Sequence, residues 1–155
     1  MVITTDNITI TSQQSVKYLG CILDDTLGGA PMALSVLGKV NARTRFLARK
    51  SSLLNQECLK TLATCLVQCH FDYAISSWYW NLNKPFQIKL QTAQNKLIRV
   101  VLGLHFRSHV GKSQFTQLQW LPIEARASQI RLMAVHRILN MRAPAYSTLT
   151  TSLKE

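Results

Sequence analysis

Residues 24–29 read Asp-Asp-Thr-Leu-Gly-Gly, and this stretch divides the chain into two parts of different character. Two adjacent glycines carry a large entropy penalty inside any regular element, so a strand or helix is expected to stop here. The residues before the stretch are rich in β-formers, whereas apolar residues after it recur at helical spacing. We therefore expect two units, residues 1–28 with β structure and residues 29–155 with helices.

The first unit contains two β-rich runs. Residues 7–11 alternate as Asn-Ile-Thr-Ile-Thr, and residues 16–23 read Val-Lys-Tyr-Leu-Gly-Cys-Ile-Leu. A polar segment, residues 12–15, separates the two runs. The simplest prediction is an antiparallel β-hairpin in which these two runs pair with each other.

The second unit is expected to form a bundle of about four to five helices, which makes the whole chain mainly α-helical. Asn55 and Asn83 are suited to cap helix N-termini, Gly103 to end a helix and Pro122 to begin one. The helices are predicted over residues 31–50, over residues 55–67, from Asn83 to Gly103, over residues 113–118 and from Pro122 to Pro144.

Side-chain type predicts which helices are buried. The second helix is nearly uncharged, so we expect it to be the central core helix. The aromatic-rich residues 71–80 are expected to pin helices together, and Trp78, Trp80 and Trp120 to pack there or at helix junctions. On the last helix, arginines such as Arg126 are expected to face largely outward, and the inward positions to include Ala134, Val135, Ile138 and Leu139.

The charge balance is one-sided. The chain has 18 Lys and Arg, and only Lys17 precedes Thr26, which leaves 17 beyond it against four acids: Glu57, Asp72, Glu124 and Glu155. Mixed ion pairs cannot neutralise such an excess, so a polyanion such as a nucleic-acid backbone is the natural partner. The cations expected to contact phosphates, chosen because they share helical faces, are Lys39, Arg43, Lys50, Lys96 and Arg99.

No catalytic or metal-binding constellation stands out. Cys58, Cys65 and Cys69 share one helical face but lack paired ligand spacing, and are expected to be buried apolar side chains. Asp24 and Asp25 are interpreted as turn residues whose carboxylates cap the backbone. We expect no catalytic residue, no metal and no cofactor. No uninterrupted apolar run could span a bilayer and no signal sequence is evident, which predicts an intracellular chain without a membrane partner.

Several segments together resemble one family. They are residues 16–24 (Val-Lys-Tyr-Leu-Gly-Cys-Ile-Leu-Asp), 71–74 (Phe-Asp-Tyr-Ala) with Trp78, 93–99 (Ala-Gln-Asn-Lys-Leu-Ile-Arg) and 118–123 (Leu-Gln-Trp-Leu-Pro-Ile). In order and separation they resemble the C-terminal part of non-LTR (LINE-type) retrotransposon reverse transcriptases, over about residues 8–150. The late segment Arg-Ala-Pro-Ala-Tyr at residues 142–146 looks like the part of that family that follows its last thumb helix.

The resemblance implies a role for each unit. Tyr18, Leu19 and Gly20 look like the primer-grip hairpin that closes the palm, and the later helices look like the thumb, which holds the template and primer by their backbones. The family polymerises with metal-binding palm aspartates, including a Tyr-x-Asp-Asp turn, and this sequence lacks that set. The chain is thus expected to be a non-catalytic fragment of an RNA-directed DNA polymerase, and the resemblance implies nuclear residence.

Two alternatives stay open. In the first, the chain is a helical interaction module, and its uncharged second helix and aromatic cluster near Trp78 are exposed and dock the missing palm and fingers. In the second, the chain is a decayed element remnant that binds no nucleic acid. If it does bind, RNA, DNA and their hybrid all suit a surface that contacts only the backbone.

Overall fold

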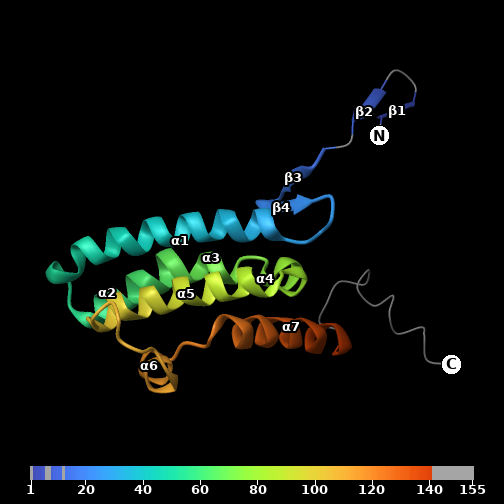
Figure 1. The fold of residues 1–155 in the computed structure, drawn as a ribbon. Helices are drawn as coiled ribbons and strands as arrows, with labels where there is room; N and C mark the ends of the chain where they lie inside the picture. The colour runs from blue at the N-terminus through green and yellow to red at the C-terminus, as the bar shows by residue number, and fades with distance from the viewer. Residues whose placement is uncertain (1, 6–7, 12, 141–155) are drawn as a thin grey trace.

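A computed structural model of the chain describes residues 2–5, 8–11 and 13–140, with side chains from residue 13 onward. Two β-hairpins precede a bundle of helices (Figure 1), which confirms the predicted mainly helical class with an N-terminal hairpin. The strands are β1 (Val2–Thr5), β2 (Ile8–Thr11), β3 (Ser15–Tyr18) and β4 (Cys21–Asp24). The main helices are α1 (Ala30–Lys50), α2 (Gln56–Ala63), α3 (Cys69–Asp72), α4 (Ile75–Trp78), α5 (Lys84–Leu102), α6 (Lys112–Leu118) and α7 (Ile123–Leu139).

Three short helical segments complete the chain path. Two are 3₁₀ turns, η1 (Ser51–Leu53) and η3 (Tyr79–Asn81). The third, η2 (Thr64–Gln68), is a π-helical segment that joins α2 to α3 without a break. A π-helical turn holds more residues than an α-helical turn, so η2 shifts the faces of α3 relative to those of α2.

The pairing predicted for the N-terminal strands is wrong. β2 pairs with β1, and residues 16–23 fold back on themselves as β3 and β4, with Tyr18 opposite Cys21. Leu19 and Gly20 both have positive φ, +46° and +82°, as a two-residue hairpin turn requires. The run of β-forming residues concealed this turn because leucine is not a typical turn residue. Residues 7 and 12 of the predicted hairpin lie outside the described residues.

The Asp-Asp-Thr-Leu-Gly-Gly stretch forms the predicted break. The Asp24 carboxylate accepts hydrogen bonds from the Thr26 hydroxyl (2.5 Å) and from the backbone N–H groups of Gly28 (3.0 Å) and Gly29 (2.9 Å). Gly29 has φ +72° and is the N-cap of α1. The turn therefore uses its carboxylate to hold the backbone, as the sequence indicated.

The predicted helix caps are present. The side-chain oxygen of Asn55 accepts from the N–H of Cys58 (2.8 Å), and that of Asn83 accepts from Phe86 (3.3 Å). Gly103, with φ +63°, ends α5. These local signals define the ends of α2 and α5 because each cap satisfies backbone groups that the helix leaves free.

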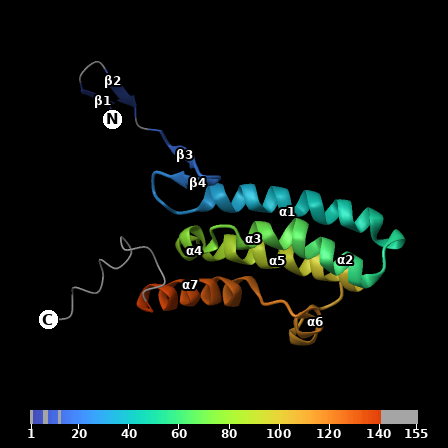
Figure 2. The same ribbon diagram turned by 180° about the vertical axis from the view of Figure 1, so that it is seen from behind.

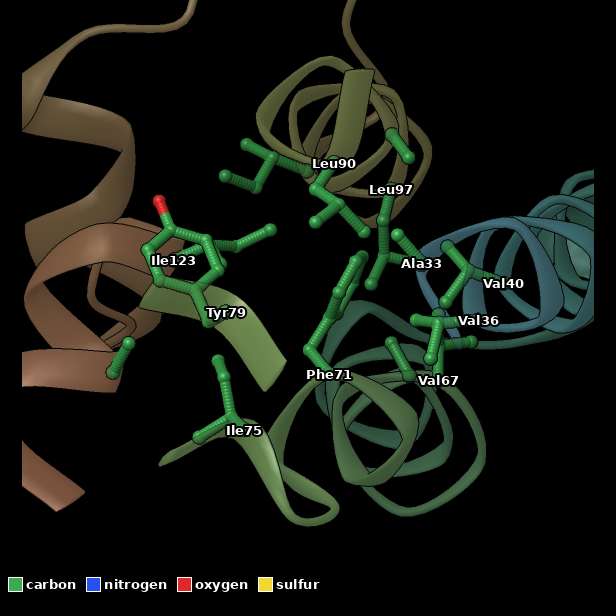
Figure 3. Packing of buried hydrophobic residues seen from close by; sticks show 14 of the residues in the cluster. Ala33, Val36, Val40, Val67, Phe71, Ile75, Tyr79, Leu90, Leu97 and Ile123 are labelled. Atoms are coloured by element: carbon green, nitrogen blue, oxygen red, sulfur yellow. The ribbon is translucent and has the colours of Figure 1, made fainter. Parts of the chain in front are cut away.

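The core is built around α5 and not around α2. In Figures 1 and 2, α5 lies between α1 and α7, and its buried side chains are Leu90, Ala93, Gln94, Leu97, Ile98 and Val101. Figure 3 shows Phe71 among Leu90, Leu97 and the small residues of α1. Over residues 55–67, where the second helix was predicted, only Leu59, Ala63 and Val67 are buried, so the expectation that this nearly uncharged helix is the central one is wrong. Threonine and cysteine made it look apolar, although both can lie at the surface.

The two halves of α7 differ in burial. Ile123 and Ala127 are buried and Ile130 is half-buried, whereas Leu132 is 68% and Leu139 66% exposed. Ala134 and Val135 are also exposed, and Ile138 is half-buried, so the predicted inward stripe fails beyond Ile130. No described element covers that half of the helix. The predicted end at Pro144 lies outside the described residues.

Candidate nucleic-acid interface

Three of the five predicted phosphate contacts lie on one edge of α1. Lys39, Arg43 and Lys50 are exposed, and their spacing places them on the same helical face. The Nη1 group of Arg43 donates a hydrogen bond to the main-chain oxygen of Leu66 (2.9 Å). This edge of α1 therefore faces η2, and one donor of Arg43 is used within the protein.

The sequence reasoning missed two further cations on α1. Arg45 and Arg49 are also exposed and lie toward the outer side of the helix. Helical spacing did not select Arg45 and Arg49, because they do not share the face of Lys39. Residues 39–50 thus present five exposed cations and no acid.

The other two predicted residues lie elsewhere. Lys96 lines a groove between α1 and α5 together with Lys89, Leu37 and Asn41, on the opposite edge of α1 from Arg43. Arg99 is half-buried, and its Nε donates to the main-chain oxygen of Ser108 (2.8 Å), which holds the loop after α5. The five predicted residues consequently do not form one surface.

The primer-grip-like residues form the tip of the second hairpin. Tyr18 is 64% and Leu19 78% exposed. The Tyr73 hydroxyl donates a hydrogen bond to the main-chain oxygen of Leu19, and a Cβ added to Gly20 would lie 3.1 Å from that hydroxyl. Glycine is thus favoured here by its positive φ and by the close approach of Tyr73, a reason that the sequence reasoning did not consider.

Almost all of the positive charge is free of carboxylates. Among residues 13–140 a single ion pair occurs, between Arg126 and Asp72 (2.9 Å). It is bidentate, since Arg126 Nε also donates to Asp72 Oδ1 (3.1 Å), and it links α7 to α3. Arg126 was expected to face outward, but its pairing with Asp72 draws it partly into the protein. The hydrogen bonds that Arg126 donates to Asp72 raise the pKa of Arg126, although partial burial opposes this.

His70 lies close to the basic edge of α1. Its Nε2 atom is buried and has no hydrogen-bond partner among the described residues. Burial lowers the pKa of His70 below its ordinary value of 6.5, and the nearby charges of Arg43 and Lys39 lower it further. The imidazole is therefore held in its neutral form beside the cations.

The three cysteines that were predicted to share a helical face lie at the surface. Cys58, Cys65 and Cys69 are all exposed, so the expectation of buried cysteines is wrong. The buried positions of α2 and η2 are Leu59, Ala63 and Val67 instead. In the described part of the chain no group of His, Cys, Asp or Glu is arranged to hold a metal ion.

Trp78 is 2% exposed and its indole N–H donates to the main-chain oxygen of Tyr73 (3.0 Å). The prediction that Trp78 packs is confirmed, and Trp78 itself is not exposed for docking, whereas Tyr73, at 49%, is exposed. Trp80 is 38% exposed, with the guanidinium of Arg131 5.6 Å from its ring centroid, and Trp120 is half-buried.

Two further findings concern membranes and known proteins. Within the described residues, no helix is both long and apolar enough to cross a membrane. A comparison of the chain with protein-family models, curated proteins and solved structures gives no match.

Proposed function

We propose that this chain binds the sugar-phosphate backbone of a nucleic-acid duplex through α1, as a non-catalytic, thumb-like part of a LINE-type reverse transcriptase. The observation that carries the proposal is the cluster of five exposed cations in residues 39–50, with no acid among them. The sequence resemblance supplies the kind of duplex, a template paired with its primer. The chain itself supplies none of the palm aspartates that polymerisation needs.

The length of the cluster suits a phosphate backbone. Eleven helical steps of 1.5 Å place Lys39 and Lys50 roughly 17 Å apart along the axis of α1. One strand of a B-form duplex carries about five phosphates over that length. Contacts of this kind position a duplex without reading its sequence, and they release counterions when they form. Binding is therefore expected to weaken steeply as salt is added.

The test compares two variants of equal charge. The first, Lys39→Gln/Arg43→Gln/Lys50→Gln, removes the edge of α1. The control, Lys84→Gln/Lys112→Gln/Arg137→Gln, removes three exposed cations from other helices. The plot of log affinity for an RNA–DNA duplex against log salt is expected to become shallower by about two to three units in the first variant only. Equal slopes in the two variants would exclude α1 as the contact surface.

A further variant separates binding from folding. Arg43 makes a hydrogen bond with Leu66 that its replacement removes, whereas Arg45 and Arg49 make none with the described residues. The double variant Arg45→Gln/Arg49→Gln should flatten the salt dependence by about one to two units while its melting temperature stays unchanged.

A second candidate function is docking to another protein, such as the missing palm and fingers. The exposed apolar half of α7 favours it, because Leu132, Val135 and Leu139 are 68%, 45% and 66% exposed. Sedimentation separates the two functions: a monomer with salt-sensitive duplex binding supports the thumb proposal. A chain that self-associates and ignores nucleic acid supports docking.

A further inference from the structure

A cavity of about 290 Å³ lies between α3, α5 and α7, and the loop between α6 and α7 contributes to its wall. Its lining is mixed. The half-buried ring of Trp120 contributes apolar surface, the amides of Gln68 and Gln119 contribute hydrogen-bonding groups, and Phe71, only 1% exposed, lies behind the wall. The Asp72–Arg126 pair lines it as well. The cavity belongs to none of the cation surfaces on α1.

The wall of the cavity is fixed by a buried amide network. Gln94 is 2% exposed, and its Oε1 accepts from Gln91 while its Nε2 donates to the main-chain oxygen of Leu121 (2.9 Å). Gln91 Oε1 also accepts from the N–H of Ile123, the first residue of α7. These bonds join the α6–α7 loop to α5, so the cavity is preformed and does not have to assemble around a ligand.

The free polar groups of the cavity select a neutral ligand. The side-chain amides of Gln68 and Gln119 form no hydrogen bond with the rest of the described chain, and each offers both a donor and an acceptor. Arg126 is neutralised by Asp72, so the lining carries no net charge and does not favour a phosphate or a carboxylate. A planar, uncharged group with donors and acceptors on its edge fits this chemistry.

We infer that the cavity receives a single unpaired nucleobase, which stacks on an aromatic ring and is held at its edge by the two glutamine amides. Carboxamides bind base edges through paired donors and acceptors, and aromatic rings stack on any base. The inference rests on the proposed function, because a chain that holds a duplex backbone meets an unpaired base wherever the duplex has a bulge or a single-stranded end. It adds a second contact, which depends on the base and not on the phosphate.

A cation lies near the cavity for the phosphate of that nucleotide. Thr64 is exposed and lines both the cavity and a neighbouring groove that Lys60 also lines. The Thr64 hydroxyl donates to the main-chain oxygen of Lys60 (2.9 Å), one helical turn earlier. A base in the cavity can thus keep its charged backbone outside, beside Lys60.

The test uses two duplexes with the same number of phosphates. One carries a single bulged nucleotide, and the other carries an abasic residue at the same place. The protein should bind the first about tenfold more tightly, since stacking of one base contributes a factor of this order. Equal affinity for both overturns the cavity inference and leaves the duplex-backbone function standing. Absence of binding to either duplex overturns both.

Variants assign the preference to the cavity. Gln119 has φ +57°, which glycine tolerates, so Gln119→Gly removes the amide without straining the backbone. This variant and Gln68→Ala should each reduce the tenfold preference to about threefold or less. Gln117→Ala is the matched control, because Gln117 is exposed and does not line the cavity. A preference that survives in both cavity variants overturns the assignment.

An NMR titration distinguishes a nucleobase from a peptide as the occupant of the cavity. In 0.5 M salt, uncharged uridine should shift the side-chain amide signals of Gln68 and Gln119. N-acetylglycinamide, which carries peptide groups without a ring, should not. Shifts caused by the peptide analogue and not by the nucleoside overturn the inference.

Discussion

The hydroxyl of Tyr73 donates a hydrogen bond to the main-chain oxygen of Leu19, which joins the end of α3 to the tip of the β3–β4 hairpin. Asn81 makes a second bridge of the same kind, from its Nδ2 to the main-chain oxygen of Leu27 (3.0 Å). Residues far apart in sequence thus fix the hairpin and the turn that follows it against the segment after α3. These polar contacts add to the packing of Cys21 and Ile22 of β4 against the core.

Replacement of Tyr73 by phenylalanine should loosen the hairpin. The ring remains but the hydrogen bond is lost, so we expect a loss of about 1 kcal/mol in the free energy of unfolding. Amide hydrogen exchange at Tyr18 and Cys21 should accelerate, while exchange within α5 stays unchanged. Tyr18→Phe is the control, since Tyr18 is exposed and its hydroxyl makes no described hydrogen bond. Identical exchange in both variants would show that the bond does not hold the hairpin.

Replacement of Gly29 and of Gly38 by alanine should change the free energy of unfolding in opposite directions. Gly29 has φ +72°, and a Cβ there would lie 2.8 Å from the main-chain oxygen of Trp78. Gly29→Ala should therefore lower the free energy of unfolding by about 1–3 kcal/mol. Gly38 lies within α1 and a Cβ there meets nothing within 4 Å. Gly38→Ala should stabilise the protein by about 0.5–1 kcal/mol. Urea unfolding of both variants tests the pair, and a stabilised Gly29→Ala would contradict the described N-terminus of α1.

The Asp72–Arg126 pair should couple α3 to α7 measurably. Its side chains are 33% and 41% exposed, so solvent screens part of the attraction. The bidentate geometry strengthens the pair, and we expect a coupling of about 1 kcal/mol in a double-mutant cycle of Asp72→Asn and Arg126→Gln. The coupling should fall in 1 M salt. A value near zero in low salt would mean that this ion pair does not hold α7.

Stability should fall as the pH is lowered through 6.5 because of His70. Burial, Arg43 and Lys39 lower the pKa of His70 in the folded protein, whereas in the unfolded chain it titrates near 6.5. Between the two values the unfolded chain binds more protons, so acidification favours unfolding until the folded pKa is reached. Urea midpoints from pH 7.5 to 5 should show this decline, and His70→Gln should remove it.

His109→Gln is the matched control for this pH dependence, since His109 is exposed in the loop before α6. Its variant should keep the decline in the urea midpoint below pH 6.5. A decline that disappears equally in both variants would contradict the assignment to His70.

The elements that the sequence predicted well depend on local chemistry. Asn55 and Asn83 cap helices and Gly103 ends one because each acts on backbone groups only a few residues away. The division at Gly28 and Gly29 is of the same kind. The existence of the helices, their approximate ends and the basic character of α1 could all be inferred without tertiary contacts.

The elements that the sequence predicted poorly depend on partners that lie far along the chain. Leu19 adopts a positive φ in a turn that Tyr73 holds from outside, and Arg126 turns inward because Asp72 is there. The five residues that were predicted to contact phosphates lie on different surfaces for the same reason. Helical spacing shows which residues share a face, but it does not show which neighbouring helix that face meets, so Lys96 and Arg43 could not be assigned to different edges.

The π-helical segment η2 makes the loss of one residue easier to accommodate here than in a regular helix. A π-helical turn holds about one residue more than an α-helical turn, so deleting a single codon between Thr64 and Gln68 would allow an uninterrupted α-helix from α2 into α3 with little change in the direction of its faces. Phe71 would keep its place in the core and Asp72 its place beside Arg126. The same deletion in the middle of α5 would instead rotate the residues that follow by roughly 100° about the helix axis and remove them from the core.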